Sequence, residues 1–201
     1  MKNQTKIAFL ILTMIAGIVL TENPARAHSF NVALVISLPD AAPVQGIQIR
    51  EGFMLATTER DSHPDQESDG HLGGLDTYVT VINSTGDVGI DITRIVAQDE
   101  IDIVVVFGPE ASVSAIGNLF DGEKAALLSP GRSPFSESER PDVAAFISAY
   151  ESVYGYKPSS HAAQGYNAAR RIDMAVRMQG GVADTASLLR SFSDTARGFT
   201  W

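Results

Sequence analysis

The chain contains no cysteine among its 201 residues. This absence excludes disulfide bonds, a catalytic thiol, cysteine-based zinc sites and iron–sulfur clusters, so any stability in an oxidising compartment has to come from packing. Motifs of several enzyme classes are missing as well: there is no Gly-x-Ser-x-Gly elbow, no Walker loop and no His-Glu-x-x-His pair. We therefore expect neither catalysis nor a cofactor.

Basic residues are few, with 15 Lys and Arg against 24 Asp and Glu, which gives a formal net charge of −9. A chain this acidic repels phosphate backbones and anionic lipid headgroups. The composition therefore predicts no nucleic-acid partner. Long hydrophobic runs are also missing, with one exception at the start of the chain.

That exception is residues 7–20, an apolar run that follows Lys2 and Lys6. Pro24 comes shortly after it, and Ala25-Arg26-Ala27 places small residues at the −3 and −1 positions of a cleavage site. The run is short for a membrane span, which needs roughly 20 residues. We predict that residues 1–27 are a signal peptide for export to the periplasm, rather than an uncleaved anchor.

Strand-like and helix-like segments alternate up to about residue 134. Short runs rich in β-branched residues predict buried parallel strands at 31–36, 77–82, 101–107 and 125–128. Helical spacing of apolar residues predicts helices at 45–60, 87–98 and 111–120, and polar residues 63–74 are expected to form a surface loop. Helices then follow at 142–154, 164–178 and 184–192. The pattern predicts an α/β fold, a three-layer parallel sheet flanked by helices.

Six segments in order resemble the periplasmic substrate-binding proteins of branched-chain amino-acid ABC transporters, the leucine-binding-protein-like type I receptors. They are Gln45-Gly46, Arg50-Glu51-Gly52-Phe53-Met54-Leu55-Ala56, Gly73-Gly74, Val104 to Ser112 around Gly108-Pro109, Leu128-Ser129-Pro130-Gly131-Arg132-Ser133, and Phe146 to Gly155 followed by Pro158 and Gly165-Tyr166-Asn167-Ala168. The resemblance implies a receptor with two lobes and a ligand held between them.

The chain departs from that family in one large respect. The resemblance implies roughly a hundred or more residues of second lobe between the Ser-Pro segment and the late helices, and here about ten residues connect them. We therefore expect residues 28–201 to form a single lobe, with the second lobe missing between about 135 and 142. A gene remnant is the other explanation for the shortened chain.

The resemblance also implies which residues contact the ligand. Ser112 lies just after the strongest predicted strand, where its hydroxyl and nearby backbone N–H groups could donate to a carboxylate, or where it could simply cap a helix. Gly131 and Ser133 match positions that offer backbone groups and a hydroxyl, although Pro130-Gly131 could equally be an ordinary turn. Gln45 matches a loop position that packs on the ligand.

Two further histidine-containing features have simpler interpretations. A run of alternating side chains could bind a divalent ion, but a flexible loop lacks the pre-organisation of a tight site, so we expect a solvated acidic loop and no metal. Its members are His63, Asp65, Glu67, Asp69 and His71. His161 stands alone beside a predicted helix start, and we expect it to be structural.

The sequence as a whole predicts a non-catalytic, periplasmic solute-binding component of an ABC-type amino-acid uptake system. Its expected partners are a small-molecule ligand such as an amino acid, the membrane subunits of a transporter, and a second copy or a separate lobe that completes the cleft. The alternative is a single-lobe protein-interaction or sensory module whose ligand site is vestigial.

Overall fold

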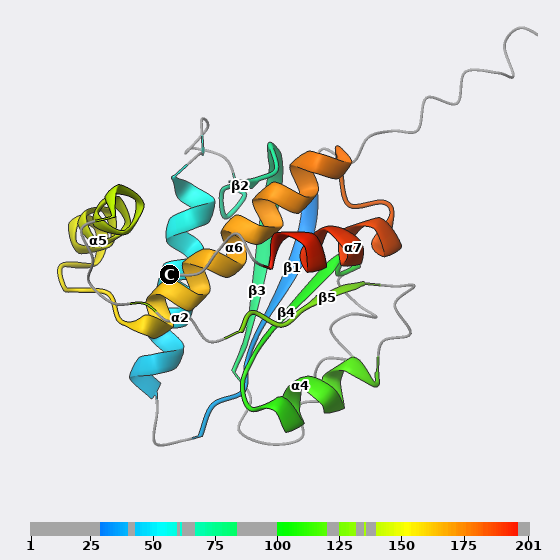
Figure 1. Cartoon of the computed structure of the whole chain (residues 1–201), viewed down its shortest axis with the longest axis horizontal. Coiled ribbons are helices and arrows are strands. Elements are labelled where there is room, and N and C mark those ends of the chain that lie inside the picture. Colours follow the sequence, from blue (N-terminus) through cyan, green and yellow to red (C-terminus); the bar gives the residue numbers. More distant parts are fainter. Residues whose placement is uncertain are drawn as a thin grey trace, which may run out of the picture.

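The central element is a sheet of mostly parallel strands, seen in a computed structural model that describes residues 29–39, 43–59, 61, 67–83, 100–119, 125–131, 135 and 140–196 (Figure 1). Its strands are β1 (Ser29–Ile36), β2 (His71–Leu72), β3 (Leu75–Asn83), β4 (Ile103–Phe107) and β5 (Ala126–Leu128). Their order is β2-β3-β1-β4-β5, with β2 antiparallel to β3 and the other pairs parallel. The predicted parallel sheet is therefore confirmed.

The central strands β1 and β4 are buried on both faces, because their side chains alternate between two apolar clusters. In β1, Leu34 and Ile36 belong to the larger cluster, whereas Val35 belongs to the smaller one on the opposite face. In β4, Val105 and Val106 divide between the clusters in the same way. Strands covered on both faces have no polar face, which is why they read as continuous apolar runs in the sequence.

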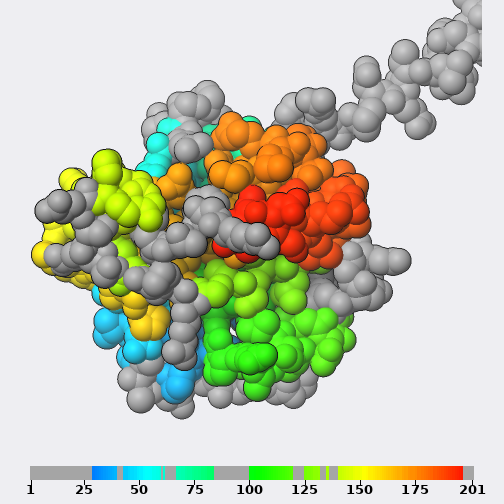
Figure 2. Space-filling model, in the orientation of Figure 1, coloured from blue at the N-terminus to red at the C-terminus, as the bar shows by residue number. Residues whose placement is uncertain are grey.

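Helices cover the two faces unequally. The helices are α2 (Pro43–Thr58), α4 (Glu110–Gly117), α5 (Pro141–Tyr154), α6 (Ser160–Gln179) and α7 (Thr185–Thr195). The larger cluster contains core residues of α2, α5, α6 and α7, whereas α4 contributes Ile116 to the smaller one. Helices α6 and α7 adjoin one another in the space-filling view (Figure 2). The result is a three-layer α/β fold, as the sequence predicts.

Most predicted elements are present with shifted ends. Helix α6 begins at Ser160 rather than at 164, and β1 begins at Ser29 rather than at 31. The expected surface loop at 63–74 is partly wrong, because β2 lies within it and pairs with the start of β3. Gly73 and Gly74 make that tight turn possible with positive φ angles of 67° and 82°. The predicted signal peptide and the helix at 87–98 lie outside the described residues.

Helix α5 is attached to α2 by a group of tyrosines around one carboxylate. The hydroxyls of Tyr150 and Tyr156 donate to Glu51 Oε2, and the Tyr154 hydroxyl donates to the Glu51 backbone carbonyl at 2.9 Å. Burial, together with the neighbouring Glu51 charge, raises the pKa of Tyr154 to about 12. These phenols therefore stay protonated, and remain donors, at any physiological pH.

Within the described residues no helix is long and apolar enough to cross a bilayer.

Candidate functional site

The carboxyl ends of β1 and β4 lie side by side at the point where the chain changes direction across the sheet. The connection from β1 leads through α2 to β3 on one side, and the connection from β4 leads through α4 to β5 on the other. The Ser37 N–H donates to the Phe107 carbonyl at 2.8 Å, which holds the two strand ends together. Open α/β sheets bind ligands in the crevice at such a switch point.

A cleft of about 460 Å³ lies at this position. Its lining comes from the loop after β1, the start of α2, the loop after β4 and the first turns of α6: Leu38, Pro39, Gln45, Ile49, Phe107, Gly108, Pro109, Ser160, His161 and Gln164. Ile49 and Phe107 are about 1% exposed and belong to the core. The cleft therefore combines an apolar floor with polar side chains, and its volume is in the range of small-molecule sites.

Helix α6 begins at the cleft because Ser159 caps it. The Ser159 hydroxyl accepts a hydrogen bond from the His161 N–H at 3.1 Å and donates to Gln48 Oε1 on α2 at 2.5 Å. The cap satisfies one of the free N–H groups of the first turn, and its bond to α2 fixes where the helix starts. Ser160, His161 and Gln164 are thereby held on the cleft wall.

Two glycines allow α2 and α6 to approach closely behind the cleft. A Cβ atom added at Gly165 would lie 2.9 Å from the carbonyl carbon of Ile49 and 3.0 Å from the Phe53 nitrogen. A Cβ atom added at Gly52 would lie 2.7 Å from the carbonyl carbon of Ala162. The two backbones are therefore in direct contact, and this contact sets the spacing between Ile49 and Gln164 in the cleft.

The structure describes three of the four predicted ligand residues, and they differ in how they lie relative to the cleft. Gln45 lines the cleft. Ser112 lies one turn beyond Pro109, is not among the lining residues, and its hydroxyl accepts a hydrogen bond from the Ser37 hydroxyl at 3.1 Å. The Gly131 carbonyl accepts a hydrogen bond from the Gln164 side chain at 3.0 Å, and Ser133 lies outside the described residues. Ligand contact by these residues stays a prediction.

Sequence reasoning missed the contribution of α6 to the cleft. His161, expected to be structural, is a lining residue, as are Ser160 and Gln164. The signal that could have placed them was Ser159, because a serine directly after Pro158 is a typical helix cap and moves the helix start four residues earlier. No charged side chain of Asp, Glu, Lys or Arg occurs among the described residues that line the cleft.

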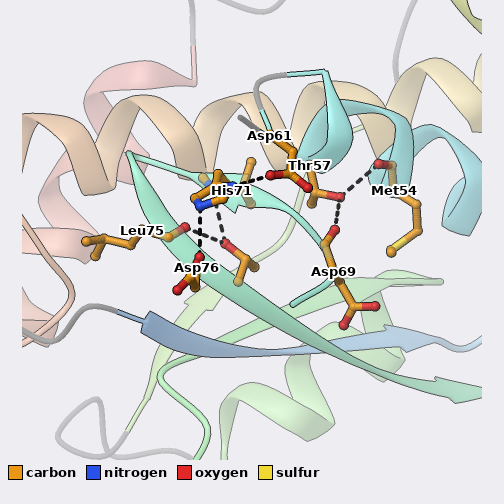
Figure 3. Close-up of polar contacts among 9 residues, drawn as sticks. Met54, Thr57, Asp61, Asp69, His71, Leu75 and Asp76 are labelled. Atoms are coloured by element: carbon orange, nitrogen blue, oxygen red, sulfur yellow. Dashed lines mark hydrogen bonds and ion pairs between the residues drawn. The ribbon is translucent and has the colours of Figure 1, made fainter. Parts of the chain in front are cut away.

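The described part of the acidic loop has structural contacts. His71 lies with Nδ1 3.0 Å from an Asp61 carboxylate oxygen and Nε2 2.8 Å from one of Asp76 (Figure 3). The Asp69 carboxylate accepts from the Val79 N–H at 2.8 Å, and the buried Thr57 hydroxyl donates to the Asp69 carbonyl at 2.7 Å. These contacts bind β2 and β3 to the end of α2.

Metal binding by this loop finds no support in the described residues. They contain no group of three or more His, Cys, Asp or Glu side chains placed to hold a metal ion. His63 and Asp65 of the same loop lie outside them.

Comparison with known proteins gives a distant structural likeness. No protein-family model matches the chain, and no curated protein matches it. Among solved structures, the chain is similar to a solute-binding protein of an ABC transporter from Rhodopseudomonas palustris BisB5 in complex with 3,4-dihydroxy benzoic acid. The identity is 11% and the TM-score 0.46, over 82% of this chain and 85% of that chain. A likeness at this level does not establish a family.

Proposed function

We propose that this chain is a non-catalytic solute-binding lobe, exported to the periplasm, for an ABC-type amino-acid uptake system of the branched-chain kind. The observation that carries the proposal is the cleft at the switch point of the sheet, with its apolar floor and a polar wall that contains no described Asp, Glu, Lys or Arg. The order of the receptor-like segments in the sequence supports the same class. The membrane subunits of a transporter would be the partners of such a lobe.

The geometry suits a small carboxylate with an apolar side chain. The side chain would pack on Ile49 and Phe107, and the carboxylate would lie near the N-terminal ends of α4 and α6, where helix dipoles favour negative charge. No side chain caps α4, whose first residue follows the cleft residue Pro109. The Ser112 hydroxyl accepts from Ser37 and keeps its own proton to donate to such a carboxylate.

A single lobe binds such a ligand weakly, because one face of the ligand stays in water. Each neutral hydrogen bond contributes about 1 kcal/mol, so losing several of them moves a micromolar site to millimolar or weaker. A second copy of the chain, or a separate lobe, would restore the missing face. We therefore expect affinity in the millimolar range for residues 28–201 alone.

Thermal unfolding of residues 28–201 with amino acids at about ten times the expected Kd, roughly 10 mM or more, tests the proposal. A ligand at about ten times its Kd stabilises by roughly 1.4 kcal/mol, or about 3–6 °C for a domain of this size. Ser112→Ala should abolish most of that rise, whereas Ser114→Ala, an exposed serine on the same helix, should leave it intact. An equal rise in both variants would refute the role of Ser112.

The second candidate function is docking of another protein with a vestigial ligand site. Val44 and Ile47 favour it, because these α2 side chains are 62% and 53% exposed on either side of Gln45. Exposed apolar side chains beside a cleft are typical of interaction surfaces when they form part of a larger patch. A cooperative melt that no amino acid shifts would favour this function over solute binding.

A further inference from the structure

The Gln164 side chain lies between the cleft and the loop that follows β5. Its Nε2 donates to the Pro130 carbonyl at 3.2 Å and to the Gly131 carbonyl at 3.0 Å. A primary amide carries its two N–H groups on one nitrogen, and here that nitrogen lies within hydrogen-bond distance of both carbonyls. The partners also fix the orientation of the amide, because a carbonyl oxygen can only accept and the nitrogen must therefore face it.

The fixed amide leaves one group of Gln164 for the cleft, the acceptor Oε1. Both hydrogen bonds that the Gln164 side chain makes in the described part of the chain come from Nε2. The other polar side chains of the wall differ in this respect, since Gln45, Ser160 and His161 can each donate. Among these polar side chains that line the cleft, Gln164 is therefore the one that offers a ligand only an acceptor.

We propose that Gln164 is a specificity-determining residue, whose Oε1 accepts a hydrogen bond from a donor group next to the ligand's carboxylate. The donor is an amino or a hydroxyl group on the carbon that carries the carboxylate. This inference rests on the proposed function, because it assigns one contact within the same cleft. A ligand with no such donor leaves Oε1 without a partner when the cleft is filled, and an unpaired acceptor weakens binding.

Three probes with one carbon skeleton test this inference: leucine, 2-hydroxy-4-methylpentanoate and 4-methylpentanoate. Their Kd values for residues 28–201 are measured by NMR titration at millimolar concentration. The wild-type chain should bind leucine, the hydroxy acid or both on the order of 2- to 10-fold more tightly than 4-methylpentanoate. The first two probes distinguish an ammonium donor from a hydroxyl donor.

Gln164→Leu should bring that ratio close to one, because it removes the acceptor. Gln179→Leu is the matched control, since Gln179 lies on the same helix and bonds Ser191 Oγ at 2.7 Å away from the cleft. It should leave the ratio unchanged. A loosened loop at Gly131 would weaken the binding of all three probes by the same factor. The ratio of their Kd values therefore separates recognition of the donor group from a merely structural role of Gln164. Gln164→Met, with a similar volume, replaces the leucine variant where the latter does not melt cooperatively.

The outcomes separate this inference from the function on which it rests. A wild-type preference that disappears in Gln164→Leu supports both. A preference that survives in Gln164→Leu and Gln164→Met, or a wild-type chain that binds the three probes equally, overturns the role of Gln164 and leaves solute binding standing. A folded wild-type chain that binds none of the probes overturns the proposed amino-acid function and this inference with it.

Discussion

Gly165→Ala tests the close approach of α2 and α6, on which the shape of the cleft depends. The added methyl carbon would lie 2.9 Å from the Ile49 carbonyl carbon and 3.0 Å from the Phe53 nitrogen. Unstrained Cβ contacts need about 3.4 Å or more. Because both neighbours are backbone atoms, no change of side-chain rotamer relieves the overlap, and the two helices have to separate.

The expected cost follows from two opposing effects. Overpacking of a core costs about 1–3 kcal/mol, and a backbone overlap belongs at the upper end of that range. Replacing a helical glycine by alanine gains up to about 1 kcal/mol of helix propensity. We expect Gly165→Ala to lower the free energy of unfolding by about 2 kcal/mol, which corresponds to a fall in Tm of about 4–8 °C for a domain of this size.

Urea and thermal denaturation of residues 28–201 measure this loss. Gly117→Ala is the matched control, since a Cβ atom at this helical glycine would meet only the end of the Leu127 side chain, at 3.4 Å. The control should keep or slightly raise the Tm. If Gly165→Ala melted at the wild-type temperature, the backbones of α2 and α6 could not be in contact as described.

Two further predictions concern polar groups outside the cleft. Burial raises the pKa of the Asp102 carboxyl. The hydrogen bond that this carboxyl accepts from the Asn31 N–H at 2.8 Å acts in the opposite direction, but the effect of burial is larger. Folding then favours the protonated form, so Asp102→Asn should increase the free energy of unfolding at neutral pH. Urea denaturation at several pH values should show this gain disappear below pH 3.8, the ordinary pKa of the group, where both side chains are neutral. Thr57→Val should lower the free energy of unfolding by about 1–3 kcal/mol, because it leaves the Asp69 carbonyl without its buried donor. Thr58→Val, whose hydroxyl bonds only within α2, should stay within about 0.5 kcal/mol in the same urea assay.

The parallel sheet could be predicted from the sequence because its central strands β1 and β4 are buried on both faces. The runs at 31–36 and 101–107 are almost continuously apolar, and they correspond to β1 and β4. Strand β2 could not be predicted in this way, since its two residues are defined by pairing with β3 and by the turn at Gly73 and Gly74. Pairing across a turn of this kind leaves no periodic pattern in so short a segment.

The site was harder to predict because its contacts join distant parts of the chain. Gln45 could be placed by resemblance, and it lines the cleft. The partner of Ser112 is Ser37, which is 75 residues away, and the partner of Gly131 is Gln164, which is 33 residues away. Hydrogen bonds over such separations depend on how the strands are ordered in the sheet, which local sequence patterns do not specify.

The short strand β2 has a consequence for how copies of this protein can meet. Next to it, the Asp69 N–H bonds the Thr77 carbonyl at 2.9 Å, the Thr77 N–H bonds the Gly70 carbonyl at 2.8 Å, and the Asp69 carboxylate takes the Val79 N–H. The first half of the outer side of β3 thus has few free backbone groups for an incoming strand. Growth of the sheet from molecule to molecule, the usual start of fibrils, is therefore blocked over that stretch.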